Sequence, residues 1–181
     1  MKILGISGSN RKGSFNTALL KEAKNALPVD TSLEIFDVSR FPLYSQDIER
    51  DPPEIIRQFK QEIKSADAIL FASPEHNYSI TAVLKNAIEW GNRPGNDNSW
   101  NGKPAAIISA SSGPRGGVRS QLHLRQIMVD LNMYPINDPE LMLGRAREAF
   151  DDNYTLKDEA AKQILRELVQ NLVVWATKIN R

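Results

Sequence analysis

The stretch that decides the fold is Lys2-Ile3-Leu4-Gly5-Ile6-Ser7-Gly8-Ser9-Asn10-Arg11-Lys12-Gly13-Ser14-Phe15-Asn16-Thr17. It begins with a short apolar run that is typical of a buried strand. It leads into a segment with helical spacing of apolar residues, at Phe15, Ala18, Leu19, Ala23, Ala26 and Leu27. The sequence therefore predicts a strand, a glycine-rich turn and a helix, with the turn at the carboxyl end of the first strand.

This turn has the composition of a phosphate site. Its glycines allow the backbone to approach a ligand closely, and the following helix begins with unpaired N–H groups and a positive dipole end. The side chains that can donate to an anion are Ser9, Arg11, Ser14, Asn16 and Thr17. We therefore expect a bound phosphate here. The alternative is a plain turn of Ser and Gly that is capped by Ser14 and binds nothing.

Two familiar phosphate loops do not match this spacing. Gly8 and Gly13 are placed as in GxxxxGK[ST], but Ser14 stands where that loop requires lysine. The GxGxxG pattern of dinucleotide sites is absent because two residues separate Gly5 from Gly8. A hydroxyl-rich loop with one arginine favours the phosphate of a monoester, held without a metal.

Strand and helix patterns alternate along the whole chain. Further strands are predicted at 33–38, 66–72, 104–110 and 132–136, with a partly strand-like segment at 140–143. Further helices are predicted at 54–64, with Asp51 as its cap, and at 80–90, 118–131 and 156–178. The pattern indicates an α/β fold in a single domain over residues 1–181, a doubly wound five-stranded parallel sheet with helices on both faces.

In the strand order 2-1-3-4-5, the first, third and fourth strands are neighbours, so the loops after them converge on one crevice. The second of these loops is Pro74-Glu75-His76-Asn77-Tyr78-Ser79, and the third is Ser111-Ser112-Gly113-Pro114-Arg115-Gly116-Gly117. Ring faces, amides and free backbone N–H groups suit a flat heteroaromatic ring with carbonyl oxygens. By itself, Glu75 is equally consistent with capping nearby backbone groups. Trp100 fits either a flexible lid or an interface anchor.

Composition excludes several classes of function. The 181 residues carry a net charge of +1, with 23 basic and 22 acidic residues, so nothing favours nucleic acid or an anionic membrane. There is no cysteine, no cluster with metal-ligand spacing and no defensible Ser-His-Asp arrangement. The first residues do not read as a signal peptide, and no apolar run is long enough to span a bilayer. We expect a cytoplasmic protein.

Taken together, the three loops resemble the NADPH-dependent FMN reductases, a family of flavodoxin-like proteins that includes chromate, quinone and azo-dye reductases. The resemblance is carried by residues 8–16, by 74–79 with Leu84-Lys85-Asn86-Ala87-Ile88-Glu89-Trp90, and by 111–113 with Gly116-Gly117. It extends over the whole chain in order and spacing. One departure is His76, where the family often has tyrosine.

The resemblance implies bound FMN, with NADPH or NADH as hydride donor. The phosphate and ribityl end would be held by Ser9, Arg11, Ser14, Phe15, Asn16 and Thr17. The ring would be lined by Pro74, Glu75, His76, Asn77 and Tyr78, and closed on its far side by Ser111 and Gly113. The cofactor supplies the chemistry, so no obligate catalytic side chain and no metal ligand is expected. Arg11, Lys12 and Arg115 are candidates for the 2′-phosphate of NADPH.

The implied activity passes a hydride to FMN and then electrons to a small acceptor such as a quinone, free flavin, azo compound or chromate, in ping-pong order. Family members are commonly homodimers or homotetramers, and the helix at 80–90 and Arg125 are candidates for that interface. One alternative is an electron-carrier flavoprotein that does not oxidise NAD(P)H, although such carriers are usually acidic. The other is a nucleotide-binding module without redox chemistry.

Overall fold

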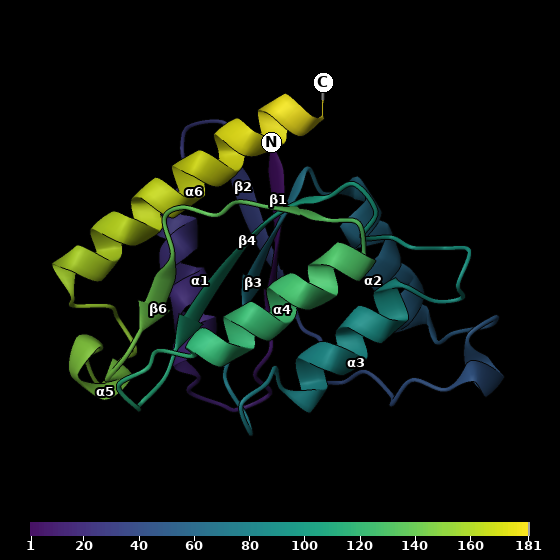
Figure 1. The fold of residues 1–181 in the computed structure, drawn as a ribbon, viewed down its shortest axis with the longest axis horizontal. Helices are drawn as coiled ribbons and strands as arrows, with labels where there is room; N and C mark the ends of the chain where they lie inside the picture. The colour runs from purple at the N-terminus through teal and green to yellow at the C-terminus, as the bar shows by residue number, and fades with distance from the viewer. Residues whose placement is uncertain (181) are drawn as a thin grey trace.

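The computed structural model describes residues 1–180, and Figure 1 shows a parallel sheet between two layers of helices. The strands are β1 (Lys2–Ser7), β2 (Ser32–Phe36), β3 (Ala68–Ala72), β4 (Pro104–Ala110), β5 (Tyr134–Pro135) and β6 (Leu141–Leu143). The helices are α1 (Phe15–Asn25), α2 (Glu54–Ser65), α3 (Ala82–Gly91), α4 (Val118–Asp130), α5 (Ala146–Ala149) and α6 (Glu159–Ile179), with a short 3-10 helix η1 (Gln46–Ile48).

The predicted strand order is confirmed, because the strands pair as β2-β1-β3-β4-β5 and all pairs are parallel. The edge position beside β4 is divided between two short strands. β5 pairs with the first residues of β4, and β6 pairs with its last residues, from Ile108 to Ala110. Pro135 and Pro139 have no N–H group to give to the ladder, so the segment between the two strands leaves the sheet. The sheet therefore has six strands, one more than the sequence predicts.

Alternate residues of each central strand face opposite helix layers. Ile3 of β1 and Leu70 of β3 are buried against α1 and α6, whereas Leu4 and Phe71 are buried against α2, α3 and α4. Because both faces are covered, these strands are apolar along their whole length, as parallel strands usually are. The alternation of strand and helix patterns along the sequence predicts helices on both faces of the sheet. Figure 1 shows α1 and α6 on the opposite side of the sheet from α4.

Trp100 is neither a lid nor an interface anchor in this structure. Its side chain is 0% exposed and lies between Phe59 and Phe71, with ring centroids 5.8 and 5.7 Å away. The indole N–H donates to the carbonyl of Ile88 at 3.1 Å. The Asn- and Gly-rich composition around Trp100 suggests that its side chain is exposed. The surrounding loop is instead fastened to α2, because the buried Lys60 of that helix lies 2.9 Å from Asp97 in the loop.

The predicted cap of α2 is also wrong. Asp51 does not cap the helix, because the N-cap residue is Pro53, which makes no side-chain cap bond. Asp51 instead pairs with Arg57 at 3.0 Å. The two prolines after Asp51 carry the chain past the position from which a carboxylate reaches the first free N–H groups.

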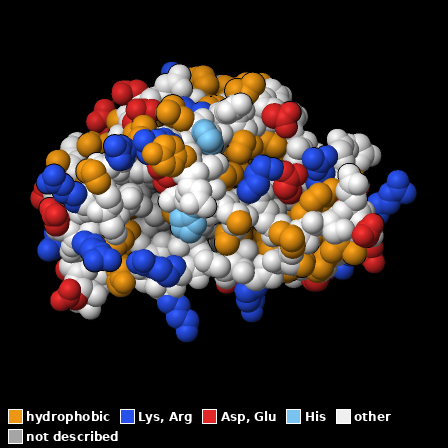
Figure 2. Space-filling model, turned by 60° about the horizontal axis from the view of Figure 1, so that its bottom comes forward, with side chains coloured by type: hydrophobic (Ala, Val, Ile, Leu, Met, Phe, Trp, Pro, Cys, Tyr) orange, Lys and Arg blue, Asp and Glu red, His pale blue; other side chains and the backbone are white. Residues whose placement is uncertain are grey.

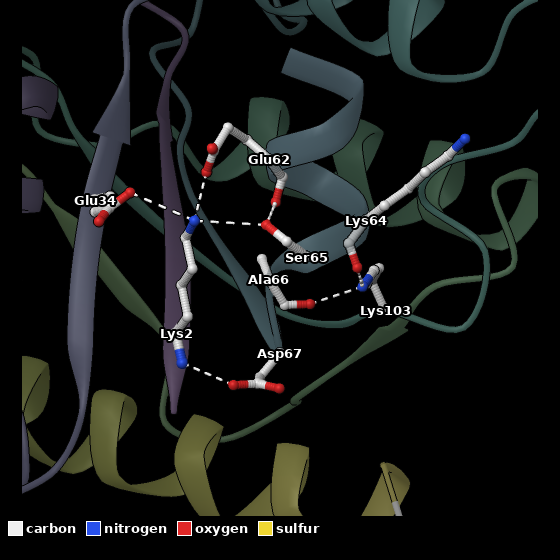
Figure 3. Close-up of polar contacts among 8 residues, drawn as sticks. All are labelled: Lys2, Glu34, Glu62, Lys64, Ser65, Ala66, Asp67 and Lys103. Carbon is white, nitrogen blue, oxygen red and sulfur yellow. Dashed lines mark hydrogen bonds and ion pairs between the residues drawn. The ribbon is translucent and has the colours of Figure 1, made fainter. Parts of the chain in front are cut away.

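At the amino end of the sheet, charged side chains are paired with other parts of the chain, as Figure 3 shows. Lys2 Nζ donates to Glu62 at 2.6 Å, and this hydrogen bond raises the pKa of Lys2. Lys103 Nζ donates to two carbonyls at the end of α2, those of Lys64 and Ala66, at 2.8 and 2.7 Å. The helix leaves these carbonyls without a partner of its own where it ends. Burial lowers the pKa of Lys103. These contacts fasten the end of α2 to β1 and to the residue before β4.

Candidate functional site

The carboxyl ends of β1, β3 and β4 open onto one cavity of about 560 Å³, a size typical of small-molecule sites. Three loops that are far apart in the sequence line it, with residues from 8–16, 74–83 and 110–112. Figure 2 brings this end of the molecule forward and shows Lys and Arg side chains along its left and lower rim. The predicted convergence of the three loops is present.

The loop between β1 and α1 supplies one end of the cavity. Ser9, Arg11, Ser14, Phe15 and Asn16 line it, as predicted for a binding site. Ser14 caps α1, with Oγ accepting the N–H of the residue three positions on at 3.4 Å. The guanidinium of Arg11 folds back and donates to the carbonyl of Gly13 at 2.8 Å. The start of α1 therefore faces the cavity from a loop that is already closed by its own hydrogen bonds.

Thr17, which the resemblance assigns to the phosphate and ribityl end of FMN, is not among the residues that line the cavity. Its hydroxyl lies 2.8 Å from Ser7 Oγ and joins the end of β1 to the first turn of α1. Side chains of successive helix residues point in different directions around the helix axis, and that of Thr17 points toward β1 rather than into the loop. Its contribution is to hold the loop in place.

Asn16 has a different role from the one that its residue type suggests. Its side chain is buried and makes two hydrogen bonds with the backbone of Ala110, donating to the carbonyl at 2.8 Å and accepting the N–H at 3.0 Å. This amide fastens the start of α1 to the end of β4, so two of the three loops are fixed relative to each other. It still contributes to the wall of the cavity.

The loop between β3 and α3 contains a tight turn from His76 to Ser79. These two residues exchange backbone hydrogen bonds of 3.0 and 2.9 Å, and the central residues Asn77 and Tyr78 have φ angles of +48° and +68°. Two successive positive φ angles define a type I′ turn. Pro74 and His76 line the cavity, whereas Asn77 and Tyr78 do not, because the turn points them outward. Tyr78 is 65% exposed.

Glu75 lines the cavity and also caps α4. Its carboxylate accepts the backbone N–H of Arg119 at 3.1 Å and pairs with the Arg119 guanidinium at 3.2 Å. The same guanidinium lies 3.8 Å from the ring centroid of Tyr78, a cation–π distance. Glu75 therefore caps a helix that is distant in the sequence rather than nearby backbone groups, and its negative charge is compensated before any ligand arrives.

The loop between β4 and α4 closes the third side. Ser111 lines the cavity, but Gly113 does not, because its N–H turns back to Ser111 Oγ at 3.1 Å. Gly117 begins α4 with a φ of +88°, a conformation that only glycine adopts without strain. Of this loop only Ser111 and Ser112 line the cavity, so it brings little side-chain bulk to the third side.

Several residues of the cavity were missed in the sequence. The lining residues that were not predicted are Gly8, Asn10, Thr81, Ala82, Val83, Ala110 and Ser112. Thr81 is the most informative, because it caps α3 and its buried hydroxyl donates to the carbonyl of Gly8 at 2.6 Å. A threonine immediately before a helical run is an N-cap signal, and that signal could have located it.

Of the 181 residues, 1–148 match the model of the family described as NADPH-dependent FMN reductase. The chain belongs to this family. The chain is therefore an oxidoreductase of a flavoprotein family that uses FMN and takes its hydride from NAD(P)H.

Close relatives span the chain almost end to end. An NAD(P)H-dependent FMN reductase of Pseudomonas aeruginosa is 44% identical over 180 residues, which cover 99% of this chain and 97% of that protein. An NADPH:quinone oxidoreductase of Arabidopsis thaliana is 42% identical over 187 residues, covering 99% and 93%. The sequence resemblance to the FMN reductases is thus confirmed.

The fold of the family is also found among solved structures. FerB, a flavoenzyme NAD(P)H:(acceptor) oxidoreductase from Paracoccus denitrificans, superposes with a TM-score of 0.89 at 31% identity, covering 98% of this chain and 97% of that chain. Together with the strand order, this confirms the predicted flavodoxin-like fold class.

The cavity fits the cofactor of the family. At one end the start of α1 offers N–H groups to a phosphate, and at the other the loops after β3 and β4 form walls for a flat ring. The exposed side chains of Asn10, His76 and Ser112 line the cavity and make no hydrogen bond within residues 1–180, so their polar groups can meet a ligand. Among the described residues, no group of three or more His, Cys, Asp or Glu could hold a metal ion. No helix in residues 1–180 is long and apolar enough to cross a membrane.

Proposed function

We propose that this cavity binds FMN with its phosphate on the β1–α1 loop and its ring between the β3–α3 and β4–α4 loops. The observation that carries the proposal is the single cavity at the carboxyl ends of β1, β3 and β4, with the start of α1 at one end. The residues assigned to the phosphate end are Ser9, Arg11, Ser14, Phe15 and Asn16. Those assigned to the ring are Pro74, Glu75, His76 and Ser111, with Asn77, Tyr78, Thr17 and Gly113 shaping the loops from outside.

Bound FMN would accept a hydride from NAD(P)H and then pass two electrons to an acceptor. We propose a quinone, since a relative is named as a quinone oxidoreductase. With a quinone, the balance is NADPH, a proton and quinone giving NADP⁺ and hydroquinone. The protein has to hold the ring rigidly and leave one face open to both substrates in turn, which leads to ping-pong kinetics.

The test is the visible spectrum of the purified protein, followed by anaerobic addition of NADPH and then of a benzoquinone. Flavin bands that bleach with NADPH and return with quinone support a quinone reductase. Bands that persist with NADPH favour the electron-carrier alternative, and a protein that cannot be reconstituted with FMN contradicts the flavin assignment. Parallel lines in a double-reciprocal analysis would support ping-pong order, whereas intersecting lines would contradict it.

Preference for NADPH would come from cations at the rim of the cavity. Arg11, Lys12 and Arg115 are exposed, and Arg115 makes no side-chain hydrogen bond within residues 1–180. Arg115→Ala is expected to raise the KM for NADPH about fivefold to tenfold while changing the KM for NADH little, because only NADPH carries the 2′-phosphate. An equal effect on both donors would contradict this assignment.

We also propose that the chain forms a homodimer or homotetramer through α3 and α4. A hollow of about 440 Å³ lies between these helices and shares Thr81 and Ala82 with the main cavity. Val129 of α4 is 81% exposed. Arg125 is a weaker interface candidate, because its guanidinium bonds within its own chain to the carbonyl of Ile136 at 3.0 Å. Light scattering on the purified protein tests the proposal, and a monomer at micromolar concentration contradicts it.

A further inference from the structure

Tyr154 lies beyond residue 148, where the family match ends, but it touches the phosphate loop. Its ring packs against Phe15 with centroids 5.4 Å apart, and Phe15 packs in turn against Phe150 at 5.2 Å. Phe15 lines the cavity, whereas Tyr154 does not. A residue outside the family match therefore supports the back of the loop that faces the ligand.

The turn that carries Tyr154 is well fastened. The carboxylate of Asp151 accepts the N–H groups of Asn153 and Thr155 at 2.9 and 2.8 Å, and the N–H of Tyr154 donates to the carbonyl of Asp151 at 3.0 Å. Phe150 and Leu156, at the two ends of the turn, pair with each other and are buried in the core beside α6. Tyr154 is thus presented from a turn that the core holds in place.

The hydroxyl end of Tyr154 lies directly over Gly13. A Cβ at Gly13 would be 2.7 Å from Tyr154 Cζ and would overlap the hydroxyl oxygen. Gly13 also has a φ of +71°, and its carbonyl accepts the guanidinium of Arg11. The tyrosine therefore closes over the glycine of the loop whose carbonyl holds Arg11.

We propose that Tyr154 is a positioning residue for the phosphate of the bound flavin. It acts through Gly13 and Phe15, by keeping the loop from Ser9 to Ser14 in the shape in which its donors converge on the cavity. This inference rests on the proposed function, since it takes the loop to be the phosphate site. It assigns to the carboxyl-terminal part of the chain a share in cofactor affinity that the family match does not include.

The expected effect follows from the population of the closed loop. If removal of the ring leaves the loop in its binding shape for only about a tenth to a fifth of the time, the apparent Kd rises about fivefold to tenfold. The loss concerns the phosphate end alone, so a flavin without phosphate is affected little. A side chain with a merely structural role would instead lower stability and leave the ratio of the two affinities unchanged.

The test compares FMN and riboflavin binding to the apoprotein by fluorescence quenching. Tyr154→Ala is expected to weaken FMN binding about fivefold to tenfold and riboflavin binding less than twofold. Tyr154→Phe keeps the ring on Phe15 and is expected to retain affinity within about twofold of the original protein. Tyr134→Ala is the matched control, since Tyr134 is 40% exposed, close to the 39% of Tyr154, but lies on β5 away from the cavity.

Each outcome bears on a separate claim. If the original protein binds FMN and Tyr154→Ala has an unchanged ratio of FMN to riboflavin affinity, the positioning role is overturned, whether or not the melting temperature falls. If Tyr154→Phe is as weak as Tyr154→Ala, positioning by the ring is overturned as well. If the original protein binds neither flavin, the proposed function itself fails. Should Tyr154→Ala not fold, Tyr154→Leu, which keeps apolar volume on Phe15, gives the same comparison.

Discussion

The two ends of the same sheet are built in opposite ways. At the amino end, Lys2 pairs with Glu62 of α2 and Glu34 of β2, and Lys103 donates to the carbonyls of Lys64 and Ala66 where α2 ends (Figure 3). At the carboxyl end, the hydrogen bonds lie behind the loops, as with Asn16 and Thr81, while Asn10 and Ser112 face the cavity without a partner among residues 1–180.

The difference is informative because both ends share the same strands and the same core. Polar groups that satisfy each other contribute to stability, and polar groups that line a cavity without a partner in the chain are available to a ligand. A parallel sheet provides this asymmetry, since helix N-termini gather at its carboxyl end. Substitutions at the amino end should therefore change stability alone, and those at the carboxyl end should also change flavin binding.

The largest expected effect is that of Asn16→Leu. It leaves the buried N–H and carbonyl of Ala110 unpaired, which costs about 2–5 kcal/mol in the free energy of unfolding, and it loosens two loops of the cavity. The matched control is Asn98→Leu at the amino end, where the amide also makes two backbone bonds, to Leu131 at 2.9 Å and Trp100 at 3.0 Å. Urea unfolding should show a loss in both variants, and FMN titration a loss only in Asn16→Leu. Equal loss of FMN affinity in both variants would contradict the stated difference between the two ends of the sheet.

Arg11→Ala should have a medium effect that is confined to the phosphate. Loss of one charge-assisted contact is expected to raise the Kd for FMN about tenfold, or about 1.4 kcal/mol, with riboflavin unchanged. Because Arg11 is exposed, stability should change by less than about 0.5 kcal/mol. Isothermal titration with both flavins measures the difference. A similar loss for riboflavin would place Arg11 at the ring instead.

Asp97→Asn should have the smallest effect, on stability only. Burial raises the pKa of Asp97, but hydrogen bonds and charges from Lys64 and Lys60 outweigh it, so the pKa is lowered in the folded state. A lowered pKa contributes stability above the unfolded value of about 3.8, and this contribution is lost as pH falls through the folded value. We expect about 1 kcal/mol at pH 7, discounted because the side chain is 39% exposed.

Urea unfolding of Asp97→Asn and of the original protein from pH 7 to pH 2.5 checks this sign. The difference in free energy should shrink toward zero below pH 3.8. A difference that grows as the pH falls would contradict the stated pKa direction. FMN affinity should be unchanged at pH 7, and any loss there would weaken the contrast between the two ends.

The strand order and the position of the cavity followed from the sequence because they depend on local patterns. Apolar runs locate the strands, and parallel pairing brings the loops after the first, third and fourth strands together. What could not be predicted depends on partners that are distant in the chain. Asn16 lines the cavity, but nothing local in the sequence shows that its amide is bonded to Ala110. Trp100 was misread because its loop is polar, and its burial is explained only by its packing between Phe59 of α2 and Phe71 of β3.

Hydrogen–deuterium exchange with and without FMN tests the asymmetry most directly. We expect slower exchange on FMN binding in residues 8–17, 74–83 and 110–117, at the carboxyl ends of β1, β3 and β4. We expect no change in residues 62–67 and 98–103 at the amino end. Protection that is equal at both ends, or confined to the amino end, would contradict the assignment of the carboxyl-end cavity as the flavin site.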